Sequence, residues 1–201
     1  INVQAHDLTK HQSKPILGDA KVSLQLLKAL STNYKVSSDY ISKYTAAKEK
    51  WLKDLEKITA PSLMNSLPSD SQVIGAVNRS VPENTIVIGA AGSMPGELHK
   101  LWKVLDQNTY HMEYGYSCMG YEISAGIGVN LATPNRPNVV FSGDGSYLMM
   151  NSELATAAMM GISMTLILTN NKGYGCINRL QKATGGAEFN NLFSDSKFDK
   201  Q

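Results

Sequence analysis

Short apolar runs alternate with polar, glycine-containing turns through the second half of the chain. Residues 138–142 are rich in β-branched and aromatic side chains and precede a glycine, which is typical of a buried parallel strand. Residues 163–169 form a second run of this kind. Between the two runs, residues 152–160 have the pattern of a helix, with Asn151 as its expected N-cap and Gly161 at its end.

Strand, helix and strand in this order make a βαβ unit, whose strands are parallel and whose crossover is right-handed. Upstream, residues 85–94 predict a strand that runs into a glycine-containing turn. A helix is expected to start at Pro95, with Glu97 in its first turn. Together these elements predict a three-layer α/β fold, a mainly parallel sheet with helices on both faces.

The N-terminal part of the chain has a different pattern. Two short strand-like pieces, at 1–4 and 15–17, precede a helix that Asp19 caps and that runs to about Leu30. The stretch that follows is polar and rich in Lys, Ser and Tyr, and helical pieces are expected in it. We therefore expect three parts: residues 1–30, a helical linker over 31–60, and the α/β domain over 61–201.

Composition excludes several classes of partner. The 201 residues include 19 basic and 17 acidic ones without a basic run that contains aromatic residues, so a nucleic-acid partner is not expected. The apolar runs are shorter than the roughly 20 residues that span a bilayer, and the first residues lack the features of a signal sequence. Two cysteines make no disulfide framework, and a reduced, cytoplasmic setting is therefore expected.

Candidate chemistry lies where the two predicted strands end. Asp144 and Asn171 follow them directly, and open α/β sheets bind their ligands at the carboxyl ends of strands. Asp144 offers a carboxylate, Asn171 an amide oxygen and Gly173 a backbone carbonyl that no Cβ obstructs. Such an oxygen set suits a hard divalent cation such as Mg²⁺, held against a diphosphate.

The segments Gly143-Asp-Gly-Ser146 and Asn170-Asn-Lys-Gly173 resemble the cofactor motif of thiamine diphosphate (ThDP) enzymes, in the acetolactate synthase and pyruvate decarboxylase group. The resemblance implies the ThDP-binding pyrophosphate-domain fold, with Mg²⁺ as a second cofactor. It also implies three cation ligands: Asp144, Asn171 and the carbonyl of Gly173. The diphosphate contacts of the family match five residues here: Gly92, Ser93, Met94, Gly145 and Ser146.

A third segment, 117–121, agrees with the same family. Its members place a bulky apolar residue between the two rings of ThDP, and Met119 stands at the matching position. An apolar and adaptable methionine suits such a wedge. Backbone groups of Ser117 and Met119 would then bind the edge of the aminopyrimidine. The alternative is that Met119 is an ordinary core residue.

Within the ThDP enzymes, three stretches are similar to the trihydroxycyclohexane-1,2-dione hydrolases of myo-inositol breakdown: 113–123, 146–153 and 171–190. Carboligases of the family typically lack a carboxylate at the position of Glu122. The resemblance implies Mg²⁺- and ThDP-dependent cleavage of a C–C bond in a polyhydroxylated cyclic dione, which gives 5-deoxy-glucuronate. Such a ring needs hydrogen-bonding groups, and the candidates for them are Asn178, Arg179 and Gln181. The alternative is that these three side chains merely face solvent.

The resemblance also implies that the chain is a fragment. Residues 1–30 would be the C-terminal end of a central domain, and 61–201 a pyrophosphate domain truncated at its C-terminus. An N-terminal pyrimidine-binding domain normally supplies the glutamate that activates ThDP, so no catalytic residue is assigned here. The fragment alone is expected to bind Mg²⁺ and ThDP weakly and to be inactive. The family places ThDP between subunits, which implies a homodimer or homotetramer.

Two other functions remain open. An acetolactate synthase-like carboligase or a 2-oxoacid decarboxylase would act on pyruvate instead. A non-catalytic module of the ThDP fold is the alternative from another class, although the intact Asp144, Asn171, Gly173 and Met119 argue against a degenerate site. A generic nucleotide-binding domain is disfavoured, because the chain lacks a phosphate loop with Lys-Ser or Lys-Thr.

Overall fold

A computed structural model of the chain describes residues 1–61 and 66–193. The chain forms two compact units, residues 1–52 and residues 53–201. Within the described ranges, no helix is both long enough and apolar enough to cross a membrane.

The first unit is helical. It contains two short 3-10 helices, η1 (Ala5–Asp7) and η2 (Lys10–Gln12), then α1 (Ala20–Leu30) and most of α2 (Ser38–Ile58). The expected cap of α1 is confirmed, because Asp19 Oδ1 accepts the N–H of Val22 at 2.9 Å. The two strand-like pieces make only an isolated parallel bridge between Asn2 and Leu17, since 3-10 helices occupy the residues between them.

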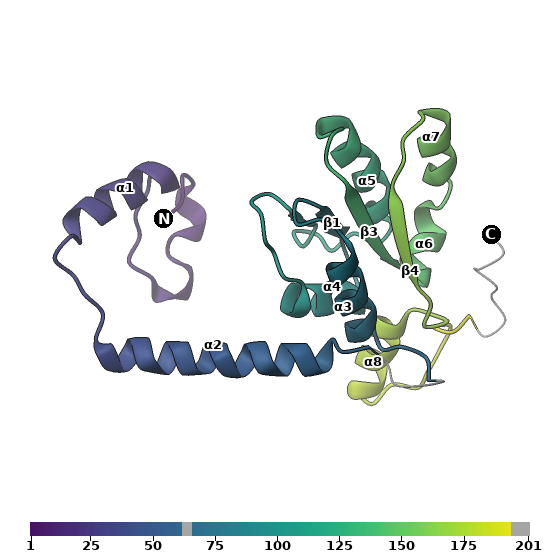
Figure 1. Cartoon of the computed structure of the whole chain (residues 1–201), viewed down its shortest axis with the longest axis horizontal. Coiled ribbons are helices and arrows are strands. Elements are labelled where there is room, and N and C mark those ends of the chain that lie inside the picture. The colour runs from purple at the N-terminus through teal and green to yellow at the C-terminus, as the bar shows by residue number, and fades with distance from the viewer. Residues whose placement is uncertain (62–65, 194–201) are drawn as a thin grey trace. The chain divides into compact units, whose positions relative to one another are not determined.

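The second unit is built on a four-stranded parallel sheet with the order β2-β1-β3-β4. Figure 1 labels β1, β3 and β4 of this sheet. Its strands are β1 (Ile86–Gly89), β2 (Tyr110–Met112), β3 (Asn138–Gly143) and β4 (Thr165–Thr169). The strands predicted within residues 85–94, 138–142 and 163–169 are thus confirmed. In register, Val140 pairs with Ile88 on one side and with Leu166 on the other.

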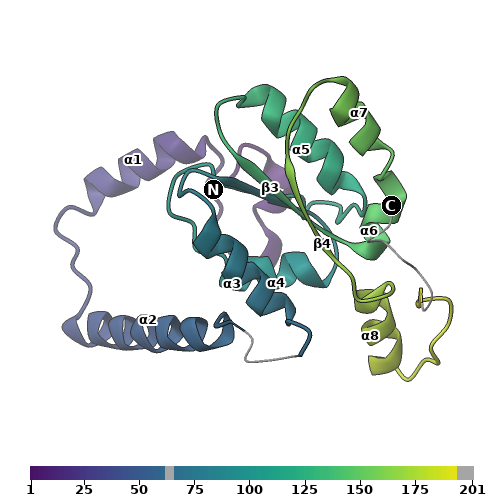
Figure 2. The same cartoon turned by 45° about the vertical axis from the view of Figure 1, so that its right-hand side comes forward.

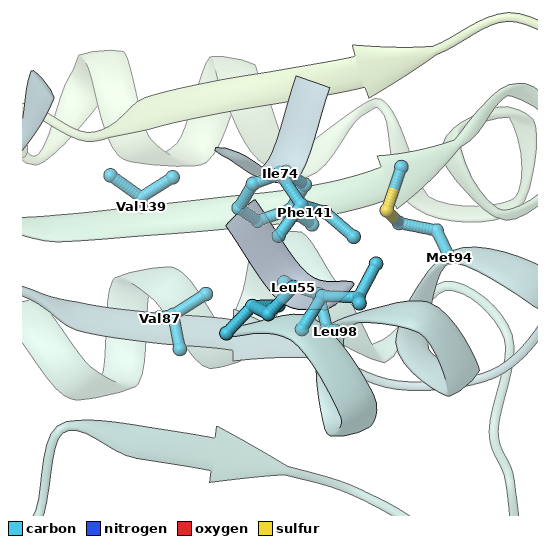
Figure 3. Packing of buried hydrophobic residues seen from close by; sticks show 8 residues of the cluster. Leu55, Ile74, Val87, Met94, Leu98, Val139 and Phe141 are labelled. Atoms are coloured by element: carbon cyan, nitrogen blue, oxygen red, sulfur yellow. The ribbon is translucent and has the colours of Figure 1, made fainter. Parts of the chain in front are cut away.

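Helices cover both faces of the sheet, which confirms the three-layer α/β fold (Figure 2). On one face, Val87 and Phe141 pack with Leu98 of α4 (Ser93–Leu101) and Ile74 of α3 (Asp70–Ser80), and Leu55 of α2 joins them (Figure 3). On the other face, Ile86, Ile88 and Val140 pack against Ala125 of α5 (Tyr121–Ala132). Ile123 and Tyr147 continue this second layer.

The region between β3 and β4 differs from its predicted form. It contains two helices, α6 (Asp144–Met150) and α7 (Glu153–Met159), where one was expected. Asn151 ends α6 and is not the N-cap of α7, whose N-cap is Ser152 without a side-chain capping bond among the described residues. The polar residues 151–152 therefore form the turn between two helices. The helical end at Gly161 is confirmed, with φ +67°.

Other elements were not expected from the sequence. They are the edge strand β2, the helix α3, and α8 (Gly175–Ala183) as a defined helix. In addition, α4 begins at Ser93, so that Pro95 is its third residue and Glu97 lies beyond the first turn.

The strand order determines where a ligand can bind. The chain leaves β1 toward β2 on one side and continues from β3 to β4 on the other side. The carboxyl ends of β1 and β3 therefore flank the point at which the strand order reverses, and open α/β sheets bind ligands in the crevice at such a point.

Candidate functional site

A cavity of about 190 Å³ lies at the carboxyl ends of β1, β3 and β4. All ten residues predicted from the sequence as cation or cofactor contacts line it: Gly92, Ser93, Met94, Ser117, Met119, Asp144, Gly145, Ser146, Asn171 and Gly173. These residues come from four segments that are far apart in sequence. The parallel sheet brings them together because each segment follows a strand or opens a helix at the same edge.

Asp144 is buried at the base of the cavity, as the first residue of α6 directly after β3. Its two carboxyl oxygens each accept a backbone N–H, Oδ1 from Gly145 at 3.0 Å and Oδ2 from Gly173 at 2.9 Å. Burial raises the pKa of Asp144, and these N–H groups offset only part of that rise. A bound cation would stabilise the charged form that burial disfavours.

The side-chain amide of Asn171 faces the same point. One polar atom of this amide lies 2.6 Å from the carbonyl oxygen of Gly173 and 3.3 Å from Asp144 Oδ1. When that atom is nitrogen, it donates to both oxygens. When rotation of the amide places oxygen there, three oxygens converge, and they repel one another unless a cation lies between them.

This spacing fits a magnesium ion. Neighbouring ligands of an octahedral Mg²⁺ are about 3 Å apart when the metal–oxygen distance is about 2.1 Å. The two spacings at Asn171, 2.6 and 3.3 Å, lie on either side of that value. A carboxylate, an amide oxygen and a backbone carbonyl are also the donor types that a hard cation selects. The residues present therefore fit the cation that the sequence implied.

Glycines allow the backbone to approach closely at two points of the site. A Cβ on Gly145 would lie 2.6 Å from the ring of Tyr174, and a Cβ on Gly173 would lie 2.0 Å from the carbonyl oxygen of Asn191. Neither contact is possible for a real Cβ atom. The loop after β4 thus packs against both α6 and the segment near residue 191 only because these positions are glycine.

The end of β1 contributes the opposite wall. Gly92, with φ +108°, is the N-cap of α4, and Ser93 and Met94 are the first residues of that helix. The first N–H groups of a helix have no partner within the helix, and together with the helix dipole they favour an anion such as phosphate. The position of this turn agrees with its predicted contact to a diphosphate.

A tight turn carries Ser117 and Met119 into the cavity wall. Glu113 holds this turn, because its carboxylate accepts the N–H of Tyr116 and the N–H of Cys118, each at 2.8 Å. These hydrogen bonds lower the pKa of Glu113. Met119 is half-buried at the cavity, and the hydrophobic clusters found among the described residues do not include it. Its place therefore differs from that of an ordinary core residue.

The three predicted substrate contacts lie on α8, and none of them lines the cavity. Asn178 donates to Glu188 at 2.9 Å, and Gln181 accepts a hydrogen bond from Asn191. Arg179 donates to the hydroxyl of Ser93, which does line the cavity. Of the three side chains, only that of Arg179 thus contacts the cavity wall.

Sequence patterns missed several residues of the site. Asp70, the first residue of α3, lines the cavity, and so do Tyr174 and Cys176. Burial raises the pKa of Asp70 and the Glu97 carboxylate raises it further, whereas the Arg179 guanidinium lowers it. The serine just before Asp70 forms a capping box with Gln72, which is a signal that could have located this helix start.

Comparison with known proteins agrees with this geometry. The model of a family described as "Thiamine pyrophosphate enzyme, C-terminal TPP binding domain" matches residues 90–200. Thiamine pyrophosphate (TPP) is a second name for ThDP. The matched range contains all ten predicted contacts that line the cavity.

Curated relatives are similar over most of the chain. A protein of Clostridium tetani is 38% identical over 212 residues, which cover 94% of this chain and 33% of the relative. Proteins of Geobacillus thermodenitrificans and Bacillus subtilis are 37% and 35% identical, and these matches also cover 94% of this chain and 33% of the relative. All three are named 3D-(3,5/4)-trihydroxycyclohexane-1,2-dione hydrolase. The chain spans about a third of the length of these relatives. It belongs to the thiamine pyrophosphate enzymes and contains their C-terminal TPP binding domain.

Proposed function

We propose that the protein containing this chain is a Mg²⁺- and ThDP-dependent hydrolase of trihydroxycyclohexane-1,2-dione in the degradation of myo-inositol. The observation that supports the cofactors most directly is the approach of the Asn171 amide to Gly173 O and Asp144 Oδ1. It lies at a cavity lined by all ten residues predicted as cation or cofactor contacts. The substrate comes from the name that the relatives share.

In this proposal the chain binds and orients the cofactor. Asp144, Asn171 and the Gly173 carbonyl would hold Mg²⁺, and the cation would hold the diphosphate. Backbone and hydroxyl groups would bind the diphosphate oxygens, from Gly92, Ser93, Met94, Gly145 and Ser146. Met119 would press between the rings of ThDP, and backbone groups of Ser117 and Met119 would bind the aminopyrimidine. ThDP itself supplies an electron sink for the bond that breaks.

The overall reaction adds one water to the cyclic dione. A ring C–C bond breaks, and the product is the open-chain acid 5-deoxy-glucuronate. Arg179 is the best-placed of the three predicted substrate contacts, because it reaches Ser93 at the cavity wall. The neighbouring Asp70 could accept hydrogen bonds from the hydroxyls of a polyhydroxylated ring. The glutamate that activates ThDP would come from outside this chain, from a pyrimidine-binding domain of the same subunit or a partner in a homodimer or homotetramer.

The test measures turnover by the full-length protein that contains this chain. With Mg²⁺ and ThDP present, trihydroxycyclohexane-1,2-dione and pyruvate are offered separately. Asp144→Ala is the test variant, and Asp39→Ala is the control, since Asp39 is exposed on α2 and its ion pair with Lys43 is exposed as well. We expect ring opening in the wild type and the control, and none in Asp144→Ala.

Two other outcomes would change the assignment. Consumption of pyruvate without ring opening would indicate a carboligase or decarboxylase that uses the same ThDP site. Binding of ThDP without turnover of either substrate would indicate a non-catalytic module. Light scattering of the same samples tests the expected dimer or tetramer.

A further inference from the structure

Glu122 is a buried carboxyl group to which the cofactor site as described gives no role. It lies in the first turn of α5, and only 1% of its surface is exposed. Neither of its carboxyl oxygens has a hydrogen-bond partner among the residues that the structure describes. Burial of a charged carboxyl group is strongly unfavourable unless well-formed hydrogen bonds or an ion pair stabilise the charge, so the presence of Glu122 requires an explanation.

The surroundings of Glu122 connect it to the cavity. It is the second residue of α5, two positions after Gly120, and α5 packs against α6. The hydroxyl of Ser146 in α6 and the backbone N–H groups of Gly120 and Glu122 lie near the carboxyl, but none of them forms a well-aligned hydrogen bond to either oxygen. Ser146 itself lines the cavity and is one of the expected diphosphate contacts. Glu122 therefore lies behind Ser146 and does not itself line the cavity.

We propose that Glu122 is a positioning residue, whose protonated carboxyl group donates a hydrogen bond to Ser146 Oγ and so leaves the hydroxyl proton of Ser146 free to point into the cavity. The proposal rests on the proposed function, because the ligand that receives this proton is the diphosphate of ThDP. Nothing in the names of the relatives assigns such a role.

The direction of the hydrogen bond decides what Ser146 offers to an anion. A serine hydroxyl has one proton and two lone pairs. If Glu122 were a carboxylate, Ser146 would donate its only proton to it and present lone pairs to the diphosphate. When Glu122 is protonated, Ser146 accepts from Glu122 and can donate to a diphosphate oxygen. A neutral carboxyl also avoids placing a negative charge behind an anion site.

Two observations favour the protonated form. Burial raises the pKa of Glu122 above its usual value, and the nearby hydrogen-bonding groups offset only part of that rise. No ion pair within residues 1–61 and 66–193 includes Glu122, so no Lys or Arg in that part of the chain neutralises a charged form by direct contact. Ile123, the next residue of α5, belongs to an apolar cluster.

The experiment is a double-mutant cycle on cofactor binding by the full-length protein, measured by calorimetry with Mg²⁺ present. Glu122→Gln keeps a donor, Glu122→Leu removes it, and Ser146→Ala removes the hydroxyl. We expect Ser146→Ala to weaken ThDP binding by roughly tenfold, the effect of one hydrogen bond to a charged group. Glu122→Leu should weaken ThDP binding by a smaller factor, and Glu122→Gln should bind ThDP like the wild type. In a protein that already carries Ser146→Ala, adding Glu122→Leu should not weaken ThDP binding further.

Infrared spectroscopy adds a readout that a merely structural role would not affect. At neutral pH the wild type should show the C=O band of a protonated carboxyl, which shifts when ThDP binds and is absent in Glu122→Gln. Three results would overturn the proposal: absence of that band, binding by Glu122→Gln as weak as by Glu122→Leu, or an equal effect of Glu122→Leu with and without Ser146. If Glu122→Leu does not fold, the ThDP affinity of Glu122→Gln and the infrared band of the wild type still test the role of Glu122.

The failure of this proposal is distinguishable from failure of the proposed function. A wild-type protein that binds no ThDP contradicts both. A wild type that binds ThDP, with variants that follow any of the three results above, contradicts the role of Glu122 alone.

Discussion

Gly173 donates its backbone N–H to Asp144 Oδ2 at 2.9 Å, across the gap between the loop after β4 and the end of β3. A single carboxylate thus fixes the ends of two neighbouring strands relative to each other. Its other oxygen, Oδ1, lies 3.3 Å from the Asn171 amide. The positions of all three expected cation ligands therefore depend on how closely this loop can approach α6.

Replacement of Gly173 by alanine tests that dependence. The new Cβ would lie 2.0 Å from the carbonyl oxygen of Asn191, so the loop must move away. We expect Mg²⁺-dependent ThDP binding to fall by at least about tenfold, because metal sites tolerate little displacement of their ligands. Calorimetric titration measures the affinity.

Gly185→Ala is the matched control for that variant. Gly185 also has a positive φ, +82°, but an added Cβ meets nothing within 4 Å. Backbone strain there should cost about 1–2 kcal/mol of stability and leave cofactor affinity unchanged. Equal loss of ThDP affinity in both variants would show that backbone strain, and not the contact with Asn191, determines the site.

Two glycines of α5 test the packing of that helix on the sheet. A Cβ on Gly126 would lie 2.7 Å from Val140 Cγ2, whereas a Cβ on Gly128 meets nothing within 4 Å. We expect Gly126→Ala to lower the free energy of unfolding by about 1–3 kcal/mol through overpacking. Gly128→Ala should raise it by up to about 1 kcal/mol through helix propensity. Urea unfolding of the two variants measures both changes, and a similar effect of the two would contradict this packing.

Binding of Mg²⁺ should depend on pH through Asp144. The cation needs the carboxylate form, and burial raises the pKa of Asp144 above the usual 3.8. Affinity should therefore start to fall at a higher pH than for an exposed aspartate, as the pH is lowered from neutrality. Titration with Mg²⁺ at a series of pH values measures this. An affinity that stays constant until the pH approaches 3.8 would contradict the raised pKa.

Glu122 should make the stability of the protein depend on pH in the opposite sense from a salt-bridged carboxylate. Its pKa is raised in the folded state from 4.5. Its contribution to stability is therefore fully present below pH 4.5 and is lost as the pH rises through the folded-state pKa. In Glu122→Gln this titration is absent, so the variant should gain stability relative to the wild type as the pH rises. Thermal unfolding from acidic to neutral pH measures the difference, and a difference that does not change with pH would refute the prediction.

The main features of the fold and the site were predictable because they follow strong local patterns. β3 and β4 are apolar runs with turn residues after them, and parallel strands necessarily bring the residues that follow them to one edge. Asp144 and Asn171 could thus be placed together without knowledge of any side-chain contact. The cap of α1 by Asp19 is likewise a local signal.

Other features of the fold and the site depend on contacts between distant residues, which a local sequence pattern does not reveal. β2 has only three residues with His111 in the middle, and it exists because β1 offers it an edge to pair with. Asn151 resembles an N-cap, but α6 starts directly after β3 and uses Asn151 at its own end. The partners of Asn178 and Gln181 lie in the segment near residues 188–191, which removes both side chains from the cavity wall.

The turn of residues 113–118 shows how the cavity could be altered independently of the sheet. Both hydrogen bonds of the Glu113 carboxylate remain within this short segment, and Ser117 adopts its positive φ of 54° inside it. The backbone N–H of Glu113 donates to the carbonyl oxygen of Gly89 in β1 at 3.2 Å. The segment is therefore anchored to β1 at its start, and the Glu113 carboxylate holds the rest of the turn from within. A change of the side chain at Met119 would reshape the cavity wall while the backbone of the turn stays in place. One short turn with hydrogen bonds of its own thus provides a route by which the same α/β framework can be adapted to ligands of different shape.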